Sequence, residues 1–154
     1  MFQSIRTNIA KQHPDLYGVA GAFGSQADAA ANEAGLSPLL IELVKIRTSQ
    51  INGCAFCLRL HTADAIKKGE TVERLAVLSA WRETSYFTEA EMAALALSEY
   101  VTLISESKHG SDPYEAAAQA LTPAQISAIT WVTLAINTFN RIALTSAYPV
   151  APKH

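Results

Sequence analysis

Residues 37–61 read SPLLIELVKIRTSQINGCAFCLRLH and predict two helices joined by a tight break. Ser37-Pro38 marks the start of the first helix, and Asn52-Gly53 marks its end. Cys54 then lies in the first turn of the second helix. We therefore expect helices at 38–51 and 54–68, folded back on each other about Asn52.

The rest of the chain also favours helix. No stretch alternates apolar and polar residues for long enough to indicate an exposed strand, and Gly, Pro and Thr residues punctuate the helical segments. We predict an all-α fold of seven to eight helices, with the Cys-x-x-Cys sequence at the start of a central helix. The expected ranges are 2–12, 15–33, 38–51, 54–68, 72–83, 89–106, 113–120 and 123–147.

Two helix starts carry a capping box, in which a hydroxyl and a side chain three residues later satisfy each other's backbone donors. These pairs are Thr88 with Glu91 and Thr122 with Gln125. Pro123 strengthens the second start, because proline fits the first helical position. We expect helices to begin directly after Thr88 and Thr122.

Composition limits the class of protein. With 154 residues, 49% of them hydrophobic, the chain can build one core, and we expect a single domain over 1–154. The net charge is -2 with scattered Lys and Arg, so neither nucleic acid nor an anionic membrane surface is an expected partner. The N-terminal stretch lacks the long apolar run of a secretory signal, which predicts a cytoplasmic location.

The last helix, 123–147, is apolar enough that a membrane span has to be considered. Asn137, Asn140 and Arg141 lie near its middle and would be costly in lipid. We therefore expect no membrane partner, and place this helix in the core or in a subunit interface. The sequence leaves open whether the three polar residues serve an interface or the functional site.

The two cysteines are expected to be reactive and not structural. Cytoplasmic proteins rarely use disulfides as permanent cross-links, and a bridge between Cys54 and Cys57 would close a loop too short to constrain the fold. The free N–H groups and partial positive charge at a helix start favour a thiolate, the reactive form of cysteine. An ideal helix keeps the two Cβ atoms slightly too far apart for a disulfide, so the first turn has to fray for the bridge to close.

His61 and Glu42 extend this arrangement. His61 follows Cys57 by four residues on the same helical face, where it can act as a base. Glu42 stands ten residues before Asn52 and His61 nine after it, so a helical hairpin would place both at similar depth. We therefore predict a chain of interacting groups from Glu42 through His61 and Cys57 to Cys54.

Other interpretations remain open. The cysteines could be buried and inert, and Glu42 could pair with Lys45 or Arg47 on its own helix. Two thiolates with His61 and Glu42 could also bind zinc. Phe56, Trp81 and Tyr86 are candidates to shield the thiols from water, whereas His13, His109 and His154 are expected at the surface.

These residues resemble a known family. Glu42, eleven residues, Cys-x-x-Cys, three residues and His61 occur within SQINGCAFCLRLHTADAIKKGE and its upstream helix. Together with AWRETSYFTEAEMAALALSEYVTLIS and INTFNRIAL, the pattern resembles the alkylhydroperoxidase D-like (AhpD-like) branch of the carboxymuconolactone decarboxylase superfamily over residues 36 to 147. Better-characterised peroxidases of that branch carry a second histidine between the cysteines, where this chain has Ala55 and Phe56.

The resemblance implies a thiol-dependent peroxidase acting on a hydroperoxide. It makes Cys57 the peroxidatic thiol, Cys54 the resolving thiol, and His61 with Glu42 the proton relay. It also implies trimers or hexamers and reduction by a dithiol donor, either a lipoyl group or a thioredoxin-like protein, with no metal or cofactor. Muconolactone decarboxylation is not expected, because those relatives do not rely on a cysteine pair. The alternatives are a dithiol oxidoreductase or redox sensor, and a structural zinc-binding helical protein.

Overall fold

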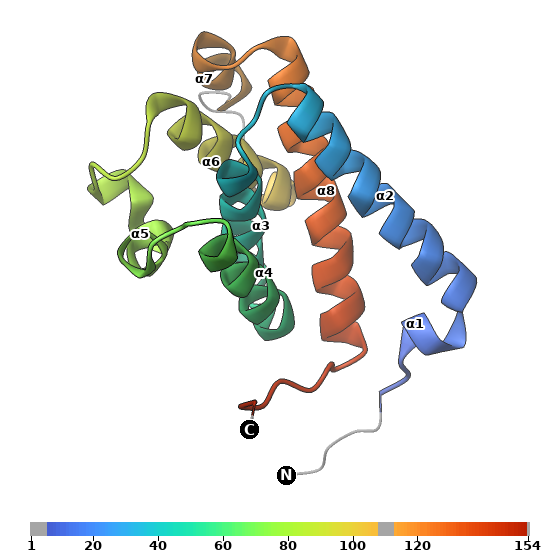
Figure 1. Ribbon diagram of the computed structural model, residues 1–154. Helices are drawn as coiled ribbons and strands as arrows, with labels where there is room; N and C mark the ends of the chain where they lie inside the picture. The colour runs from blue at the N-terminus through green and yellow to red at the C-terminus, as the bar shows by residue number, and fades with distance from the viewer. Residues whose placement is uncertain (1–5, 108–112, 154) are drawn as a thin grey trace.

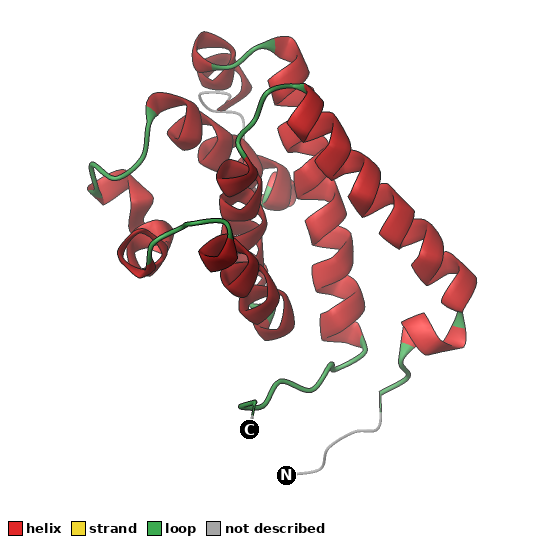
Figure 2. Cartoon of the chain, viewed as in Figure 1, coloured by secondary structure: helices red, strands yellow, loops and turns green. Residues whose placement is uncertain are grey.

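The computed structural model describes residues 6–107 and 113–153, and these residues form helices and connecting loops without a strand (Figure 2). The elements, shown in Figure 1, are α1 (Ile9–Gln12), α2 (Pro14–Glu33), α3 (Pro38–Asn52), α4 (Ala55–Lys67), α5 (Val72–Val77), α6 (Glu89–Thr102), α7 (Pro113–Ala120) and α8 (Pro123–Thr145). Two short 3₁₀ segments, η1 (Leu78–Glu83) and η2 (Ile104–Glu106), follow α5 and α6. The predicted all-α fold is confirmed.

Three of the predicted helices are too long. The helix expected at 2–12 begins only at Ile9, because the Asn8 side chain accepts the Lys11 N–H and caps the helix there; residues 1–5 lie outside the described part. The segments expected at 72–83 and 89–106 each end in 3₁₀ geometry. Ala80 interrupts the first with non-helical φ and ψ, and Leu103 leaves helical geometry at the end of the second.

Local capping explains where the main helices start and stop. Both predicted capping boxes are present, at Thr88–Glu91 and at Thr122–Gln125. The Ser37 hydroxyl accepts the Leu40 N–H at the start of α3. At the other end of α3, Gly53 adopts a left-handed φ of 69°, a conformation that glycine reaches without steric cost. The chain therefore reverses at Gly53, and α4 runs back along α3.

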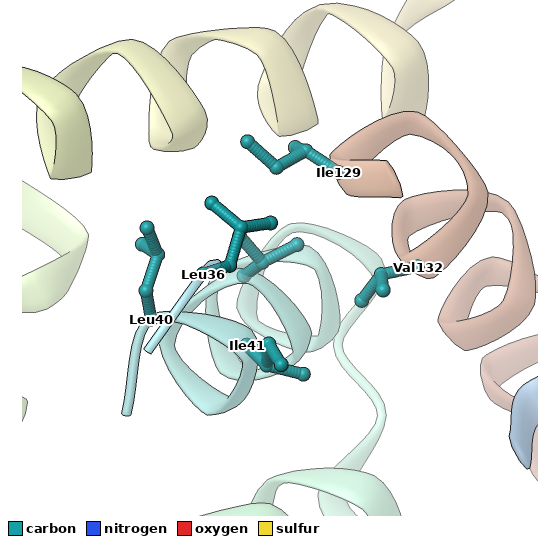
Figure 3. A pocket seen from close by; sticks show the side chains of 6 residues that line it. Leu36, Leu40, Ile41, Ile129 and Val132 are labelled. Carbon is teal, nitrogen blue, oxygen red and sulfur yellow. The ribbon is translucent and has the colours of Figure 1, made fainter. Parts of the chain in front are cut away.

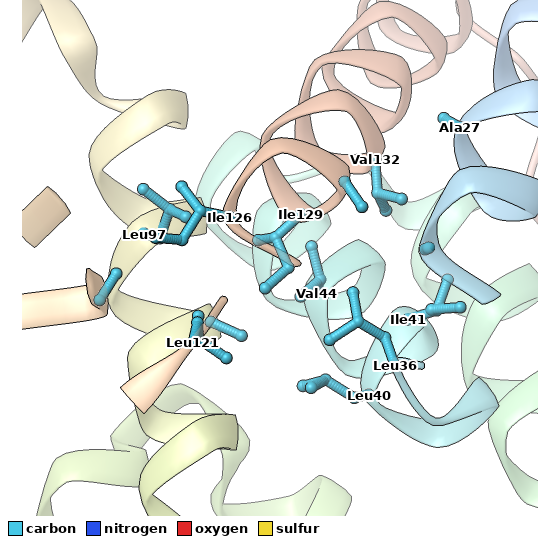
Figure 4. Packing of buried hydrophobic residues seen from close by; sticks show 14 of the residues in the cluster. Ala27, Leu36, Leu40, Ile41, Val44, Leu97, Leu121, Ile126, Ile129 and Val132 are labelled. Atoms are coloured by element: carbon cyan, nitrogen blue, oxygen red, sulfur yellow. The ribbon is translucent and has the colours of Figure 1, made fainter. Parts of the chain in front are cut away.

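The core forms where α8 packs against α2, α3 and α6 (Figure 1). Aliphatic side chains from these helices and from the turns beside them meet there, as Figure 4 shows. Helix α3 is buried on most of its circumference, including the polar residues Glu42, Thr48 and Ser49. A helix with this pattern occupies the interior of the fold. Polar side chains on α3 consequently face other protein groups.

A small apolar void lies within this core (Figure 3). It is lined by Leu36, Leu40, Ile41, Val44, Ile129 and Val132. Because the void has no room for a water molecule and carries no polar group, it is a packing irregularity and offers no chemistry to a substrate.

Helix α8 behaves as expected for a core helix. Nine of its residues are buried, among them Asn140. Over residues 6–107 and 113–153, no helix combines the length and the apolar character that crossing a bilayer requires.

Candidate active site

The two thiols meet at the start of α4. Cys54 is the N-cap residue, with an extended backbone, and its sulfur accepts the Cys57 N–H at 3.4 Å. With Cys54 in this non-helical conformation, the two Sγ atoms lie 2.8 Å apart. Both cysteines are free and only 1% and 3% exposed. The first turn therefore departs from ideal helix in the way that closing a disulfide requires.

Glu42 on α3 and His61 on α4 are in contact, as the hairpin argument predicts. The His61 Nδ1 atom lies 3.0 Å from Glu42 Oε2. The other carboxylate oxygen of Glu42 accepts a hydrogen bond from Lys68 Nζ at 2.6 Å. Sequence reasoning missed Lys68, because it stands farther from Asn52 than Glu42 does and only its long side chain reaches the carboxylate.

Direct pairing of Glu42 with a basic residue of its own helix is wrong. Lys45 Nζ instead donates to Asp28 on α2 at 2.7 Å. Arg47 Nε donates to Glu99 on α6 at 2.8 Å. Both cations therefore hold α3 to other helices, and Glu42 remains available to the histidine.

Glu42 is held as a carboxylate. Burial alone would raise its pKa, but the hydrogen bonds from His61 and Lys68 and the charge of Lys45 outweigh burial and lower the pKa to about 2. An ionised carboxylate accepts a proton from Nδ1, so it fixes the imidazole tautomer with Nδ1–H toward Glu42. In the neutral form of this ring, Nε2 is then the nitrogen that carries the lone pair.

The surroundings of Cys57 oppose the thiolate that a helix start favours. Burial and the adjacent Cys54 thiol raise the pKa of Cys57 to about 12, and the Asn140 side chain lowers it only in part. The N-cap position is taken by the Cys54 sulfur, which accepts the backbone N–H of Cys57. Cys57 therefore lies within the first turn of α4, three residues after the N-cap, and its apolar surroundings favour the neutral thiol.

The neighbours of Cys57 in the structure differ from the predicted ones in two ways. Within the described part of the chain, no hydrogen bond joins the His61 ring to either thiol, although both side chains share one face of α4. Asn140 of α8 is the polar side chain beside Cys57. The signal that could have placed it is its spacing from the apolar residues Ile136 and Ala143, which pack on the cysteines.

One of the three aromatic residues expected to shield the thiols does so. Phe56 packs on the cysteine cluster and meets the Tyr148 ring edge-on, with centroids 5.1 Å apart. Trp81 belongs to a separate core cluster and donates to Glu99.

Tyr86 is exposed, and its phenol bonds Glu73. Neither Tyr86 nor Trp81 covers the thiols. Shielding by Trp81 and Tyr86 is therefore wrong, because the loop after η1 carries Tyr86 outward.

The four donors considered for zinc do not converge. Over the described residues, the donors that lie together are Glu42, His61 and Asp64, with ligand atoms within 4.8 Å of one another, and neither cysteine joins them. Lys68 Nζ already occupies one oxygen of Glu42. A tetrahedral set built on both thiolates is therefore not assembled in this conformation.

The other histidines take no part in the site. His13 is exposed at the start of α2, as expected. His109 and His154 lie outside the described residues.

Comparisons with a family model, a related sequence and a solved structure agree on the family of this chain. Residues 14–100 match the model of the carboxymuconolactone decarboxylase family. The uncharacterized protein YdfG of Bacillus subtilis strain 168 is 40% identical over 112 residues, which cover 73% of this chain and 76% of that protein. A crystal structure from Agrobacterium tumefaciens, of a protein of unknown function described as a candidate antioxidant defence protein AhpD, is 32% identical. It has a TM-score of 0.85 and covers 97% of this chain and 100% of its own. The chain therefore belongs to the carboxymuconolactone decarboxylase family and has an AhpD-like fold.

Proposed function

We propose that this protein is a thiol-dependent peroxidase of the alkyl hydroperoxide reductase type. One observation carries the proposal: two free thiols 2.8 Å apart lie at the start of the helix that also holds His61 against Glu42. A dithiol can pass between reduced and disulfide states, and the histidine supplies a base one turn away. The described AhpD-like neighbour from Agrobacterium supports the same class of reaction.

The first step forms a sulfenic acid. His61 Nε2 accepts the Cys57 proton, directly or through water, and the thiolate attacks the distal oxygen of a hydroperoxide. The S–O bond forms as the O–O bond breaks, so the sulfur is oxidised and the peroxide is reduced to an alcohol. The leaving alkoxide takes up the proton held by His61. Glu42 keeps Nδ1–H oriented throughout and stabilises the imidazolium that forms.

The second and third steps regenerate the thiols. The Cys54 sulfur attacks the Cys57 sulfenic acid, and the S–S bond forms as water leaves. An external dithiol, a lipoyl group or a thioredoxin-like protein, then reduces this disulfide by exchange and becomes a disulfide itself. A reducing cytoplasm would supply such donors.

The high pKa of Cys57 shapes this mechanism. At neutral pH the resting thiol keeps its proton, so the thiolate has to be produced during the reaction by the histidine. The expected peroxidase rate therefore rises with pH, and removal of His61 lowers it.

A second function is favoured by the same geometry. Sulfurs held at 2.8 Å readily close to a disulfide, whereas a mostly protonated Cys57 attacks peroxide slowly. A dithiol–disulfide oxidoreductase, or a sensor oxidised once per signal, would use the first property alone. Steady-state peroxide consumption separates the two, since a sensor stalls after one turnover.

The test is peroxide consumption with dihydrolipoamide as donor. Cys57→Ser should abolish the reaction, and Cys54→Ser should leave a sulfenic acid that a dimedone probe traps at Cys57. Thr138→Ala on α8, which removes a half-buried hydroxyl bonded within the same helix, serves as a control that keeps full turnover. Equal activity in the two cysteine variants would contradict the assigned roles. If the unmodified protein exchanges disulfides normally but does not turn over peroxide, the oxidoreductase is favoured.

Self-association is part of the proposal. Leu16 and Val19 on α2 are 66% and 67% exposed, and Trp131 on the adjoining α8 is 51% exposed. A group of large exposed apolar side chains on neighbouring helices favours a protein interface. We expect a trimer or hexamer in analytical ultracentrifugation, and Val19→Lys should dissociate it if this face is the contact.

A further inference from the structure

Asn140 is fully buried on the face of α8 that covers the cysteine pair. Its neighbours one turn away, Ile136 and Ala143, both pack in one cluster with Cys54 and Cys57. Residues at these spacings share one side of a helix, so Asn140 lies on the side that faces the thiols. Its own exposure is 0%. A buried amide in this place needs partners for both its oxygen and its nitrogen.

A network of hydrogen bonds anchored on a backbone carbonyl determines which way the Asn140 side-chain oxygen points. The Asn137 Nδ2 atom donates to the Thr133 carbonyl at 2.9 Å, so Asn137 Oδ1 must turn the other way. Asn52 Nδ2 donates both of its protons, one to Asn137 Oδ1 and one to Asn140 Oδ1, each at 2.9 Å. The Asn140 oxygen therefore points toward Asn52, at the end of α3.

The nitrogen of Asn140 faces the opposite direction. It donates to Ser49 Oγ at 3.0 Å. Ser49 spends its own proton on the Lys45 carbonyl at 2.8 Å, so the serine can only accept from Asn140. An amide nitrogen carries two protons, so a second N–H of Asn140 is left beyond the bond to Ser49.

We propose that Asn140 is a positioning residue of the redox site, whose second amide N–H is held on the Cys57 sulfur by Asn52 and Ser49. This inference rests on the proposed function for the role of Cys57, and it names the side chain that stabilises negative charge there. A hydrogen bond to the charged form of a group favours that form, and a buried donor is not competed for by water. The same N–H can stabilise the charge that develops on the sulfur during attack.

The other groups around Cys57 act in the opposite sense or lie farther off. Among the described residues that influence the thiol, burial and Cys54 raise its pKa, and Asn140 lowers it. The Tyr148 phenol interacts with Cys57 from the segment after α8, and His61 lies one turn along α4. The asparagine therefore opposes surroundings that otherwise keep the thiol neutral.

The test follows the alkylation rate of Cys57 by iodoacetamide against pH in a Cys54→Ser background. Cys57 is then the only cysteine, because the chain contains two. Adding Asn140→Leu should move the pH profile upward by about one unit, which is about tenfold less thiolate below the midpoint. Below the midpoint, a lower thiolate fraction and poorer access both scale the rate by one factor at every pH, so the rate is also measured with the bulkier reagent N-ethylmaleimide. A lower thiolate fraction slows both reagents by the same factor, whereas poorer access slows the bulkier reagent more.

Three comparisons make the outcome decisive. Ile136→Val disturbs the same packing without removing a donor, and its profile should coincide with that of the parent. Asn140→Ser, which restores a small donor, should recover part of the shift. If Asn140→Leu does not fold by circular dichroism, the half-buried Asn52→Ala decides, with a smaller upward shift expected. An unmoved profile in the folded variant would overturn the inference.

Peroxide turnover is measured separately on the variants that keep both cysteines. A shifted alkylation profile without turnover in the parent protein would refute the proposed peroxidase and leave the role of Asn140 standing. Peroxide turnover in the parent protein with an unmoved alkylation profile would support the peroxidase and refute the role of Asn140.

Discussion

The His61 Nδ1 atom lies 3.0 Å from Glu42 Oε2, which ties the middle of α4 to α3 across the hairpin. Glu42 is only 2% exposed and also accepts from Lys68. A buried carboxylate with two such donors stays ionised well below the usual range of glutamate. This pair therefore links the stability of the hairpin to the orientation of the base in the site.

Glu42→Gln should remove a pH dependence of stability. The folded-state pKa of Glu42 is lowered from 4.5 to about 2, so its contribution is present above 4.5 and is lost as pH falls through this window. We expect the free energy of unfolding of the native chain to fall about 3 kcal/mol more than that of the variant over this range. Urea denaturation at a series of pH values measures the difference. Parallel curves for the two proteins would refute it.

Lys68→Ala and Lys67→Ala form a matched pair of adjacent substitutions. Lys68 Nζ lies 2.6 Å from the buried Glu42 carboxylate, whereas Lys67 is 78% exposed and 3.8 Å from Asp64. After allowance for solvent screening of the half-exposed ammonium, Lys68→Ala should cost about 1 kcal/mol and Lys67→Ala less than about 0.5. Urea denaturation at neutral pH measures both. Equal losses would mean that Lys68 contributes no more than a surface pair.

The sequence predicted the helices most accurately where local chemistry sets their ends. Capping boxes, Ser37-Pro38 and Asn52-Gly53 act through neighbouring residues, and the structure has these boundaries within about a residue. The sequence-based prediction failed where the continuation of a helix depends on backbone geometry that amino-acid composition does not reveal. Ala80 is a good helix former by propensity, yet its φ of -117° breaks the helix after α5.

The candidate site shows the same limit. The Glu42–His61 contact followed from counting residues on two helices joined by a turn. Asn140 could not be placed in this way, because Ser49 lies on a helix whose rotation relative to α8 depends on packing of the whole core. Lys68 stands sixteen residues after Asn52 and Glu42 ten before it, so counting does not pair them, and the long lysine side chain spans the difference. The environment of Cys57 depends on the same packing, since burial by α8 raises the pKa of this thiol against the favourable position near the helix start.

Thr122→Ala should destabilise the fold through the start of α8. The Thr122 hydroxyl accepts the Gln125 N–H at 3.2 Å, and Gln125 Oε1 accepts the Thr122 N–H at 3.0 Å. Loss of an N-cap hydroxyl costs about 1 kcal/mol. Thr138→Ala, which removes a half-buried hydroxyl bonded only within the same helix, should cost less than about 0.5 kcal/mol. Thermal unfolding of both variants checks the difference, and equal melting temperatures would contradict it.

Tyr148→Ala should open the thiols to solvent. Its ring packs edge-on against Phe56, and Arg59 Nη1 holds the same segment through the Ala151 carbonyl at 2.6 Å. Because this cover blocks access to Cys57, its removal should raise the alkylation rate several-fold, and more for the bulky N-ethylmaleimide than for iodoacetamide, whereas loss of an amide donor changes both rates by the same factor. Tyr86→Ala removes an exposed ring away from the cysteine cluster and should leave the rate unchanged. If the Tyr148 variant reacts no faster than this control, the route to the sulfurs lies elsewhere on the surface.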